Sequence, residues 1–403
     1  MSSSAPITPS RSWTRLDGVD LLRGLAIFFV VMNHINIRLI GADVPYAKDL
    51  PKQLMHVLVW NGQLGVQMFF VVSGFLIASI SLRRWNPLSR ISLRDFYILR
   101  FARIAPLLLA LLAILSALHF ARVPHFVVTG KTGGLGRALL AALTFHVNVL
   151  EARHGYLPAN WDILWSLSVE EMFYLFFPLI ARMFGRGYWF VALLLACIVL
   201  GPFDRTVWAH GNEIWQEYGY LGGMEGIALG CLTALVVSRI RFSSVIVRAL
   251  GIIGAAVVSC SLIFSWQGYT GWLGRIGLNM TVLGVGTAVF IAATAQTRWR
   301  SPRLFSPLLR MGQYSYEVYL THMFVVWTFF ALFLKAGSRM RLVPLLFVIT
   351  ILCAGALGFL VAHFYSEPLN RKLRNRFDEG PQRLGSALEP SPAAAVENPL
   401  LDK

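Results

Sequence analysis

Long apolar runs alternate with short polar segments along this chain, and this pattern predicts transmembrane helices. A helix needs roughly 20 mainly apolar residues to cross a bilayer core. The run at 188–202 is short and 138–150 predicts a partial helix at the interface, so nine or eleven spans remain possible. We therefore predict an all-α integral membrane protein, a bundle of about ten transmembrane helices. The runs cover residues 19–38, 57–82, 99–119, 162–183, 188–202, 219–238, 247–266, 276–296, 314–334 and 343–364.

The composition supports a membrane protein. Of 403 residues, 56% are hydrophobic and 14% are charged, and the mean hydropathy is +0.61. These values exclude an ordinary soluble domain. The cysteines lie inside apolar runs without CxxC spacing, so the sequence predicts neither a disulfide framework nor a thiolate metal site. The histidines also lack ligand spacing, so we expect no metal.

The chain carries a formal net charge of +16, and its basic residues are spread over many short flanks. If the N-terminus is cytoplasmic, the inner flanks hold roughly twice as many Lys and Arg as the outer ones, so the positive-inside rule predicts that both termini are cytoplasmic. A nucleic-acid-binding patch is not indicated, because the charges do not gather on one face.

The two ends of the chain are polar. The start, 1–15, is too polar for an obvious cleaved signal peptide, so we expect the first helix to be retained. The Pro-, Ala- and Ser-rich end predicts a disordered cytoplasmic tail over 376–403, leaving 1–375 as the transmembrane domain.

The first predicted helix carries two polar residues on one face. Arg23 and His34 are eleven residues apart, which is about three turns, so both side chains project to the same side, about 16 Å apart along the axis. Ionisable side chains inside hydrocarbon are costly and mark functional sites by default. This spacing predicts that an anion held at Arg23 reaches inward to His34.

Two further predicted helices carry polar groups that imply a polar interior. The fourth span holds Glu170 and Glu171, whose side chains point about 100° apart, so that one faces the interior and the other pairs elsewhere. In the ninth span, Ser315, Tyr319 and His322 follow helical spacing and share a stripe.

The third span begins with Arg100 and Arg103, one helical turn apart. Such a pair suits bidentate binding of phosphate, although interfacial anchors have the same appearance. The stripe FFVVSGFLI at 69–77 predicts helix packing, with Gly74 allowing close approach. The connection 120–160 is long enough to cover an outer opening.

These motifs together resemble the acyltransferase-3 family of integral membrane O-acyltransferases. Each motif is weak alone, but their order and their placement on the predicted spans make the set specific. The segments that carry the resemblance are LDGVDLLRGLAIFFVVMNH at 16–34, GVQMFFVVSGFLI at 65–77, RFAR at 100–103, WSLSVEEMFYLFFP at 165–178, GQYSYEVYLTH at 312–322 and FYSEPLNRKL at 364–373.

The resemblance implies a ten-helix bundle of the bacterial inner membrane that moves an acyl group, usually acetyl, from a cytoplasmic thioester to sugars outside. It makes His34 the essential histidine, Arg23 its helix-mate, and Arg100 and Arg103 the donor-side arginines. Gln67 and Met172 depart from the family, since many relatives show Asp and Gln there. No segment is long enough for the fused esterase-like domain of some members.

The resulting hypothesis is a continuous groove through the bundle. Acetyl-CoA, or another acyl-CoA, would place its phosphates on the three arginines while its pantetheine arm runs toward His34. His34 would act as general base on a carbohydrate hydroxyl or carry the acyl group itself. Glu171 or Glu170 would orient the imidazole, and Ser315, Tyr319 and His322 would contact substrate.

Other functions fit the same residues. The same chemistry could acylate a small molecule, and a polar core with His and Glu is also typical of a proton-coupled transporter. A lipid-binding or assembly factor without catalysis is a third interpretation. Pairing of Glu170 and Glu171 with Arg to hold helices together is the alternative interpretation of these two residues. Membrane lipids are expected partners, and the sequence does not predict an oligomeric state.

Overall fold

The computed structural model describes residues 16–48, 50–297 and 299–386. Within these ranges the chain is helical and contains no strand. Ten helices of the described residues are long and apolar enough to cross a membrane, and each overlaps one predicted run. The expected all-α bundle is therefore confirmed. The short run at 188–202 gains length because helix α8, Tyr188–Phe203, continues as a π-helix, Asp204–Trp208.

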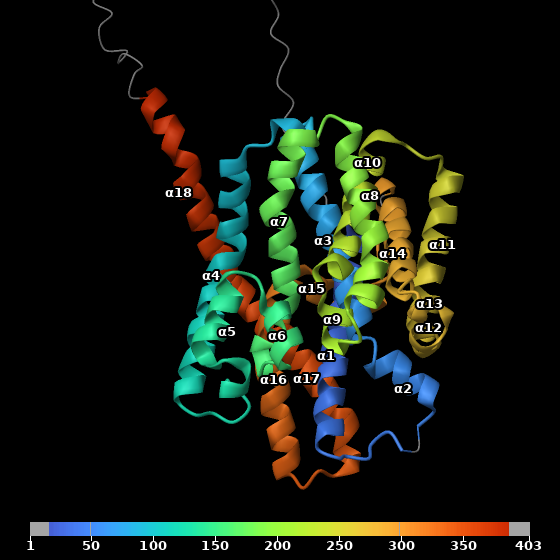
Figure 1. The fold of residues 1–403 in the computed structure, drawn as a ribbon, viewed down its shortest axis with the longest axis vertical. Coiled ribbons are helices and arrows are strands. Elements are labelled where there is room, and N and C mark those ends of the chain that lie inside the picture. The colour runs from blue at the N-terminus through green and yellow to red at the C-terminus, as the bar shows by residue number, and fades with distance from the viewer. Residues whose placement is uncertain (1–15, 49, 298, 387–403) are drawn as a thin grey trace, which may run out of the picture.

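The helices run mainly along the long axis of the molecule (Figure 1). The bounds of the longer helices are α1 Asp17–Gly41, α3 Gly62–Arg84, α4 Leu93–Phe120, α7 Leu164–Phe184, α8 Tyr188–Phe203, α10 Tyr220–Arg239, α11 Ser244–Ile263, α14 Asn279–Gln296, α16 Ser315–Lys335, α17 Val343–Val361 and α18 Glu367–Ser386. The shorter ones are α2 Lys52–Val59, α5 Gly134–Leu143, α6 Val147–His154, α9 Glu213–Tyr218, α12 Ser265–Thr270, α13 Trp272–Arg275 and α15 Ser306–Gln313. Single turns are η1 Leu88–Arg90, η2 Gly130–Thr132, η3 Ala159–Trp161, η4 Asp204–Trp208, η5 Arg303–Phe305, η6 Met340–Leu342 and η7 Ala362–Ser366.

One end of the bundle carries the arginine-rich turns and is called the basic end. In Figure 1 it is the upper end, where the turns α3–α4, α7–α8 and α10–α11 lie. These turns hold Arg83, Arg84, Arg186, Arg239 and Arg241. The α1–α2 connection and the α16–α17 turn lie at the opposite end.

The connection 120–160 is structured. It contains η2 and the helices α5 and α6; α5 packs against α4 and α6 packs against α7 (Figure 1). Helices α5 and α6 fall where the sequence predicts a partial helix at 138–150. The segment after α6 lines a cavity described below, as expected for a connection that covers an opening.

The end of the chain differs from its prediction. Helix α18 continues to Ser386, so residues 376–386 are helical where a disordered tail is expected. The sequence of this helix explains the difference, because Leu, Arg and Lys are good helix formers and Arg371 pairs with Glu367 one turn away at 3.8 Å. The rest of the predicted tail and the polar start, 1–15, lie outside the described residues.

Helices α3 and α10 approach each other through glycines. A Cβ atom added at Gly74 would lie 1.9 Å from the Ile227 carbonyl oxygen, and one at Gly230 would lie 2.0 Å from that of Val71. Any side chain would therefore push the two backbones apart. The expected packing role of Gly74 is confirmed. In lipid, where the hydrophobic effect does not drive helices together, small residues allow this close packing.

We predict that Gly74→Ala lowers the stability of the folded protein by about 1–3 kcal/mol or more, because overpacking forces the backbones to shift. The expected observation is a clear drop in the midpoint of thermal unfolding in detergent. Gly136→Ala in α5 is the matched control, since a Cβ atom there meets nothing within 4 Å. An unchanged midpoint for Gly74→Ala would contradict this view of the α3–α10 contact.

Candidate functional site

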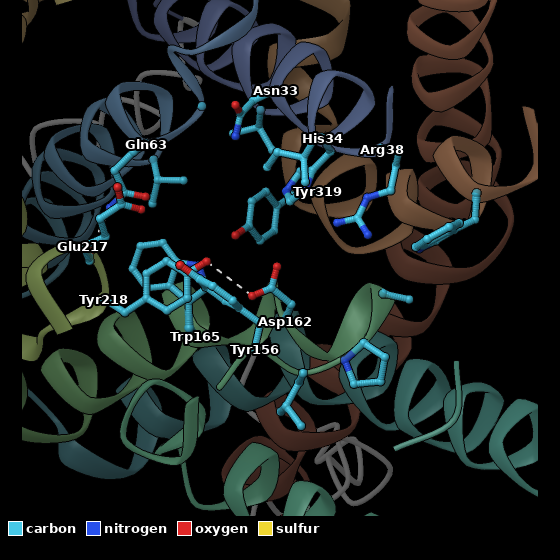
Figure 2. Close-up of a pocket in the computed structure, with 18 of the residues that line it drawn as sticks. Asn33, His34, Arg38, Gln63, Tyr156, Asp162, Trp165, Glu217, Tyr218 and Tyr319 are labelled. Atoms are coloured by element: carbon cyan, nitrogen blue, oxygen red, sulfur yellow. Dashed lines mark hydrogen bonds between the residues drawn. The ribbon is translucent and has the colours of Figure 1, made fainter. Parts of the chain in front are cut away.

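A cavity of about 490 Å³ lies around His34 and is called the His34 cavity. Its wall combines the second half of α1, the start of α3, and the segment that joins α6 to α7 (Figure 2). Aromatic rings and polar groups alternate around it. The lining residues are Val30, Asn33, His34, Ile37, Arg38, Gly62, Gln63, Val66, His125, Tyr156, Leu157, Pro158, Ala159, Asp162, Trp165, Glu217, Tyr218, Tyr319 and Trp327.

His34 meets a second histidine from α16. The ring centroids of His34 and His322 are 5.1 Å apart, and His322 is fully buried. His322 Nδ1 lies 2.6 Å from the Tyr319 carbonyl oxygen. Because a carbonyl oxygen only accepts, Nδ1 carries the proton and Nε2 keeps its lone pair. Within the described residues, His34 Nδ1 and His322 Nε2 are buried without hydrogen-bond partners.

Asp162 provides a carboxylate in the same cavity. The Tyr218 hydroxyl donates to Asp162 Oδ1 at 3.3 Å (Figure 2). The Tyr218 ring stacks on Trp165 with centroids 4.0 Å apart. Trp165, Tyr218 and Tyr156 together form an aromatic wall opposite His34 in this view, and flat aromatic surfaces of this kind suit the apolar faces of sugar rings.

Arg38 lies one helical turn beyond His34 and lines the same cavity. Its guanidinium group lies 4.7 Å from the centre of the Trp327 ring. His125, from the connection after α4, stacks on the same Trp327 ring, with ring centroids 3.9 Å apart. It is exposed, but it also forms part of the cavity wall.

Glu151 of α6 fixes the segment that closes this wall. Its Oε1 accepts a hydrogen bond from the Leu157 N–H at 2.9 Å, and its side chain is fully buried. Burial raises the pKa of Glu151 well above its ordinary value, and the nearby Asp162 charge raises it further. Burial and the charge of Glu217 raise the pKa of Tyr156 to about 12. Both shifts favour the neutral forms of these side chains.

A second cavity of about 360 Å³ contains the three predicted arginines and is called the arginine cavity. It lies between α1, α3, α4, α7 and α16. One side is apolar, and the other carries the charged groups. The lining residues are Arg23, Val66, Phe69, Phe70, Val72, Ser73, Leu76, Ile77, Ile80, Arg100, Arg103, Ile104, Ser166, Leu167, Glu170, Tyr174, Ser315, Tyr316, Tyr319 and Leu320.

The sequence predicts helix packing for the stripe 69–77, and this is only half of its role. Gly74 packs against α10, as described above. Phe69, Phe70, Ser73, Leu76 and Ile77 face the arginine cavity instead. A helix between a neighbouring helix and a cavity shows small residues on one face and larger ones on the other, which a single apolar stripe does not reveal.

Each arginine of this cavity is held by another side chain. Arg100 Nη2 lies 2.7 Å from Glu171 Oε1 and 3.7 Å from Glu170 Oε2. The Arg100 guanidinium group also lies 3.7 Å from the centre of the Tyr174 ring. Glu170 and Glu171 are therefore partners of Arg100, as expected if they hold helices together. The hypothesis that one of them orients His34 does not fit this placement, because the Arg100 pair lies on the arginine cavity.

The other two arginines have comparable contacts. Arg103 Nη1 lies 3.1 Å from Glu317 Oε1, and Glu317 is buried. Arg23 Nε donates to the Ser315 hydroxyl at 3.0 Å. Ser315 thus contacts an arginine. Arg23, Arg100 and Arg103 thus line one cavity, and each has a side-chain partner there.

Tyr319 and Val66 line both cavities and separate them. The Tyr319 hydroxyl donates to the Ile163 carbonyl oxygen at 3.0 Å and lies 2.7 Å from the Ser166 hydroxyl. The predicted groove from Arg23 to His34 is therefore interrupted at this point. Helical spacing places Tyr319 on the polar stripe, but it does not show that the ring crosses the path.

Sequence reasoning missed Asp162, Arg38 and Glu217 as cavity residues. For Arg38 a signal existed, because it follows His34 by four residues and so shares its face. Asp162 and Glu217 lie at or just before the start of a predicted span, where an acidic residue is typical of a solvated helix end. In the described ranges, no group of three or more His, Cys, Asp or Glu side chains is arranged to hold a metal ion.

The fold and the two cavities define a membrane-embedded bundle with a buried histidine and an arginine-rich site. The chain belongs to the acyltransferase-3 family: the model of this family's acyltransferase domain matches residues 16–363. The predicted family is therefore confirmed. No solved structure matches the chain.

Curated relatives carry related names. The chain is 24% identical over 393 residues to the O-acetyltransferase OatA of Staphylococcus aureus strain NCTC 8325, covering 92% of this chain and 60% of the relative. It is 27% identical over 330 residues to the peptidoglycan O-acetyltransferase OatA of Listeria monocytogenes, covering 75% of this chain and 48% of the relative. The chain thus spans about three fifths or less of the length of these relatives.

We predict that Glu151→Gln changes how stability depends on pH. A carboxyl group with a raised pKa in the folded state makes the protein less stable as pH rises above the ordinary carboxyl pKa, by about 1.4 kcal/mol per pH unit until the folded-state pKa is reached. Glutamine keeps an oxygen for the Leu157 N–H and does not ionise. The variant should gain stability over the wild type as pH rises above the ordinary carboxyl pKa, as measured by thermal unfolding.

The sign of this difference is the test. Equal loss of stability at all pH values would show that the carboxylate is ionised and needed in the fold. Glu213→Gln is the control, because Glu213 is exposed, and its pH dependence should follow that of the wild type.

Proposed function

We propose that this chain transfers an acetyl group from acyl-CoA to a hydroxyl group of a cell-surface or lipid-linked carbohydrate. The donor lies on the cytoplasmic side of a bacterial inner membrane, and the acceptor lies on the other side. Membership of the acyltransferase-3 family supports the reaction class. The names of the relatives support acetyl as the group, and one of them names peptidoglycan.

The single observation that carries the proposal is the pairing of the two cavities. One holds three arginines and the other holds His34, and they meet at the side chains of Tyr319 and Val66. A transferase that uses a charged donor on one side and an acceptor on the other needs this arrangement. The positive-inside rule supports a cytoplasmic location for the basic end.

The donor fits the arginine cavity by its chemistry. Its phosphates would lie on the N–H groups of Arg23, Arg100 and Arg103, which are positioned by their carboxylate or hydroxyl partners. The amide arm would run along the apolar face of α3 at Leu76 and Phe69. The rise from Arg23 to His34 is about 16 Å, which is of the order of an extended pantetheine arm.

His34 would act as general base. Its unpartnered nitrogen takes the proton of the acceptor hydroxyl, whose oxygen forms a C–O bond to the thioester carbonyl carbon. The C–S bond then breaks, and the proton passes from the imidazolium to the thiolate. The products are an O-acyl carbohydrate and free CoA thiol. An acyl-imidazole on His34 is the alternative route, and rapid quenching with labelled donor would trap it.

His322 would assist His34 in place of a carboxylate. Its Nδ1 proton is held by the Tyr319 carbonyl oxygen, so its Nε2 lone pair is free to accept a hydrogen bond from protonated His34. Asp162 lies in the same cavity and would stabilise the same positive charge. The acceptor would lie against Trp165 and Tyr218 with its hydroxyls toward Asp162 and Glu217.

The proposal is tested with purified protein in liposomes and acetyl-CoA labelled in the acetyl group. Release of CoA thiol that depends on an added carbohydrate, with label appearing on that carbohydrate, is the expected result. Uptake of a solute driven by a proton gradient, with no turnover of any acyl-CoA, would favour the proton-coupled transporter instead. Mass analysis of surface glycans with and without the gene identifies the acceptor, and unchanged glycans with an acylated small molecule would identify the alternative enzyme.

We predict that His34→Ala reduces acetyl transfer by about 10²–10⁴-fold or more while the protein still folds. The loss follows from removal of the base, and it should appear in kcat rather than in the donor KM. His363→Ala is the matched control, because His363 stacks on Phe359 and lines neither cavity. A His34→Ala protein with full activity would exclude the catalytic role.

We predict that Arg100→Lys raises the apparent KM for acetyl-CoA by about tenfold and changes kcat little. Lysine keeps a positive charge beside Glu171 but loses the planar fork that binds phosphate oxygens in pairs. Steady-state kinetics with varied acetyl-CoA measure the effect. An equal fall in kcat and kcat/KM, with KM unchanged, would remove Arg100 from donor binding.

A further inference from the structure

We propose that Tyr319 is the positioning residue that keeps the donor thioester away from water until an acceptor is bound. This inference rests on the proposed function, because it concerns the same two cavities. The side chain together with Val66 is called the Tyr319 partition. In the closed form it separates donor from His34, and transfer requires it to move aside.

The geometry of the partition supports a closed state. Tyr319 and Val66 are the residues that the two cavities share. The Tyr319 ring packs edge-on against Phe69 with centroids 6.1 Å apart, and its hydroxyl is bound by Ile163 and Ser166 on the far side. Figure 2 shows the ring between His34 and the Trp165–Tyr218 pair. The ring thus spans the gap between α3 and the start of α7.

The chemistry explains why such a partition is needed. Water in the His34 cavity is a competing acceptor, and the same imidazole would activate it. Its oxygen would form a C–O bond to the acyl carbon, the C–S bond would break, and the products would be acetate and CoA thiol. Excluding water until the correct acceptor is present is a common task of closing elements in enzymes.

The contacts also show how an acceptor would open the partition. Ile163 lies two residues after the turn Ala159–Trp161, and Leu157, Pro158 and Ala159 line the His34 cavity. A ligand that contacts this segment can shift it, and with it the Ile163 carbonyl oxygen that accepts the hydrogen bond from the Tyr319 hydroxyl. The two bonds are between neutral groups and have modest net strength, so the closed form opens without disruption of the fold.

The first test compares hydrolysis with transfer. Tyr319→Phe removes the hydroxyl and Ser166→Ala removes its partner. Both variants should raise acetyl-CoA hydrolysis without acceptor, relative to transfer, by about fivefold, as expected for loss of one neutral hydrogen bond. Tyr319→Ala should raise this ratio further. Adding His34→Ala to Tyr319→Phe should abolish the hydrolysis, because the water then lacks its base.

The matched control is Tyr97→Phe. Tyr97 also donates its hydroxyl to a backbone carbonyl of α7, that of Leu175, at 2.6 Å, but it lines neither cavity. Its ratio of hydrolysis to transfer should equal that of the wild type. If Tyr319→Phe and Ser166→Ala lower both activities together and leave the ratio unchanged, Tyr319 is only a binding or structural residue and the proposal fails.

A second test needs no catalysis. Ser73→Cys places a thiol in the arginine cavity, in a protein whose native cysteines Cys197, Cys231, Cys260 and Cys353 are replaced by alanine. A membrane-impermeant thiol reagent added from the side of the His34 cavity should react slowly with Cys at this position, and at least tenfold faster when Tyr319→Ala is also present. The same reagent added from the basic end should react equally with both proteins.

The two tests separate the possible failures. Fast reaction from the side of the His34 cavity with Tyr319 intact would show that no partition exists, whatever the activity of the protein. Slow reaction together with an absence of acyl-CoA turnover would leave the partition in place and reject the proposed function.

Discussion

The ion pair between Arg100 and Glu171, with 2.7 Å between its atoms, expresses the constraint on which the interior depends. A charge inside hydrocarbon costs several kcal/mol unless it finds a partner or water. The arginines of α1 and α4 and the carboxylates of α7 and α16 must therefore face one another. Their helices are fixed in rotation by this requirement, and the apolar faces turn outward. The arginine cavity is the space that remains between side chains that cannot face lipid.

The helices of the bundle could be predicted from the sequence because the bilayer imposes a length and a polarity on each span. The polar stripes on α1 and α16 could be predicted for a related reason, since each ionisable residue in a span requires an explanation. Gly74 was identified from its place in a stripe of small and aromatic residues. These predictions depend on one helix at a time.

The pairing of side chains between helices could not be predicted in the same way. Glu170 and Glu171 were placed either beside His34 or on an arginine, and only the rotation and height of α7 against α4 decides between the two. Asp162 and Glu217 belong to different spans but line the same cavity. The path of the connection before α7 brings them there. The position of Tyr319 between the cavities likewise depends on Ser166 and Ile163, far away in sequence.

The relatives named as O-acetyltransferases are longer than this chain, and the alignment covers 60% of one of them and 48% of another. The matched region holds the helices that form both cavities. The sequence identities, 24% and 27%, are low, but the family model spans residues 16–363 and so includes every residue that lines either cavity.

The walls of the two cavities come from different kinds of secondary structure. The arginine cavity is made by long helices whose rotation is set by buried charges. Much of the His34 cavity is made by the connection that contains His125 and Tyr156 to Ala159. Substitutions in connecting segments are tolerated more readily than changes in packed helices. Under the proposed function, the acceptor site can therefore vary through this connection while the donor site is kept. Grafting this one segment is then a route to new specificity without rebuilding the membrane core.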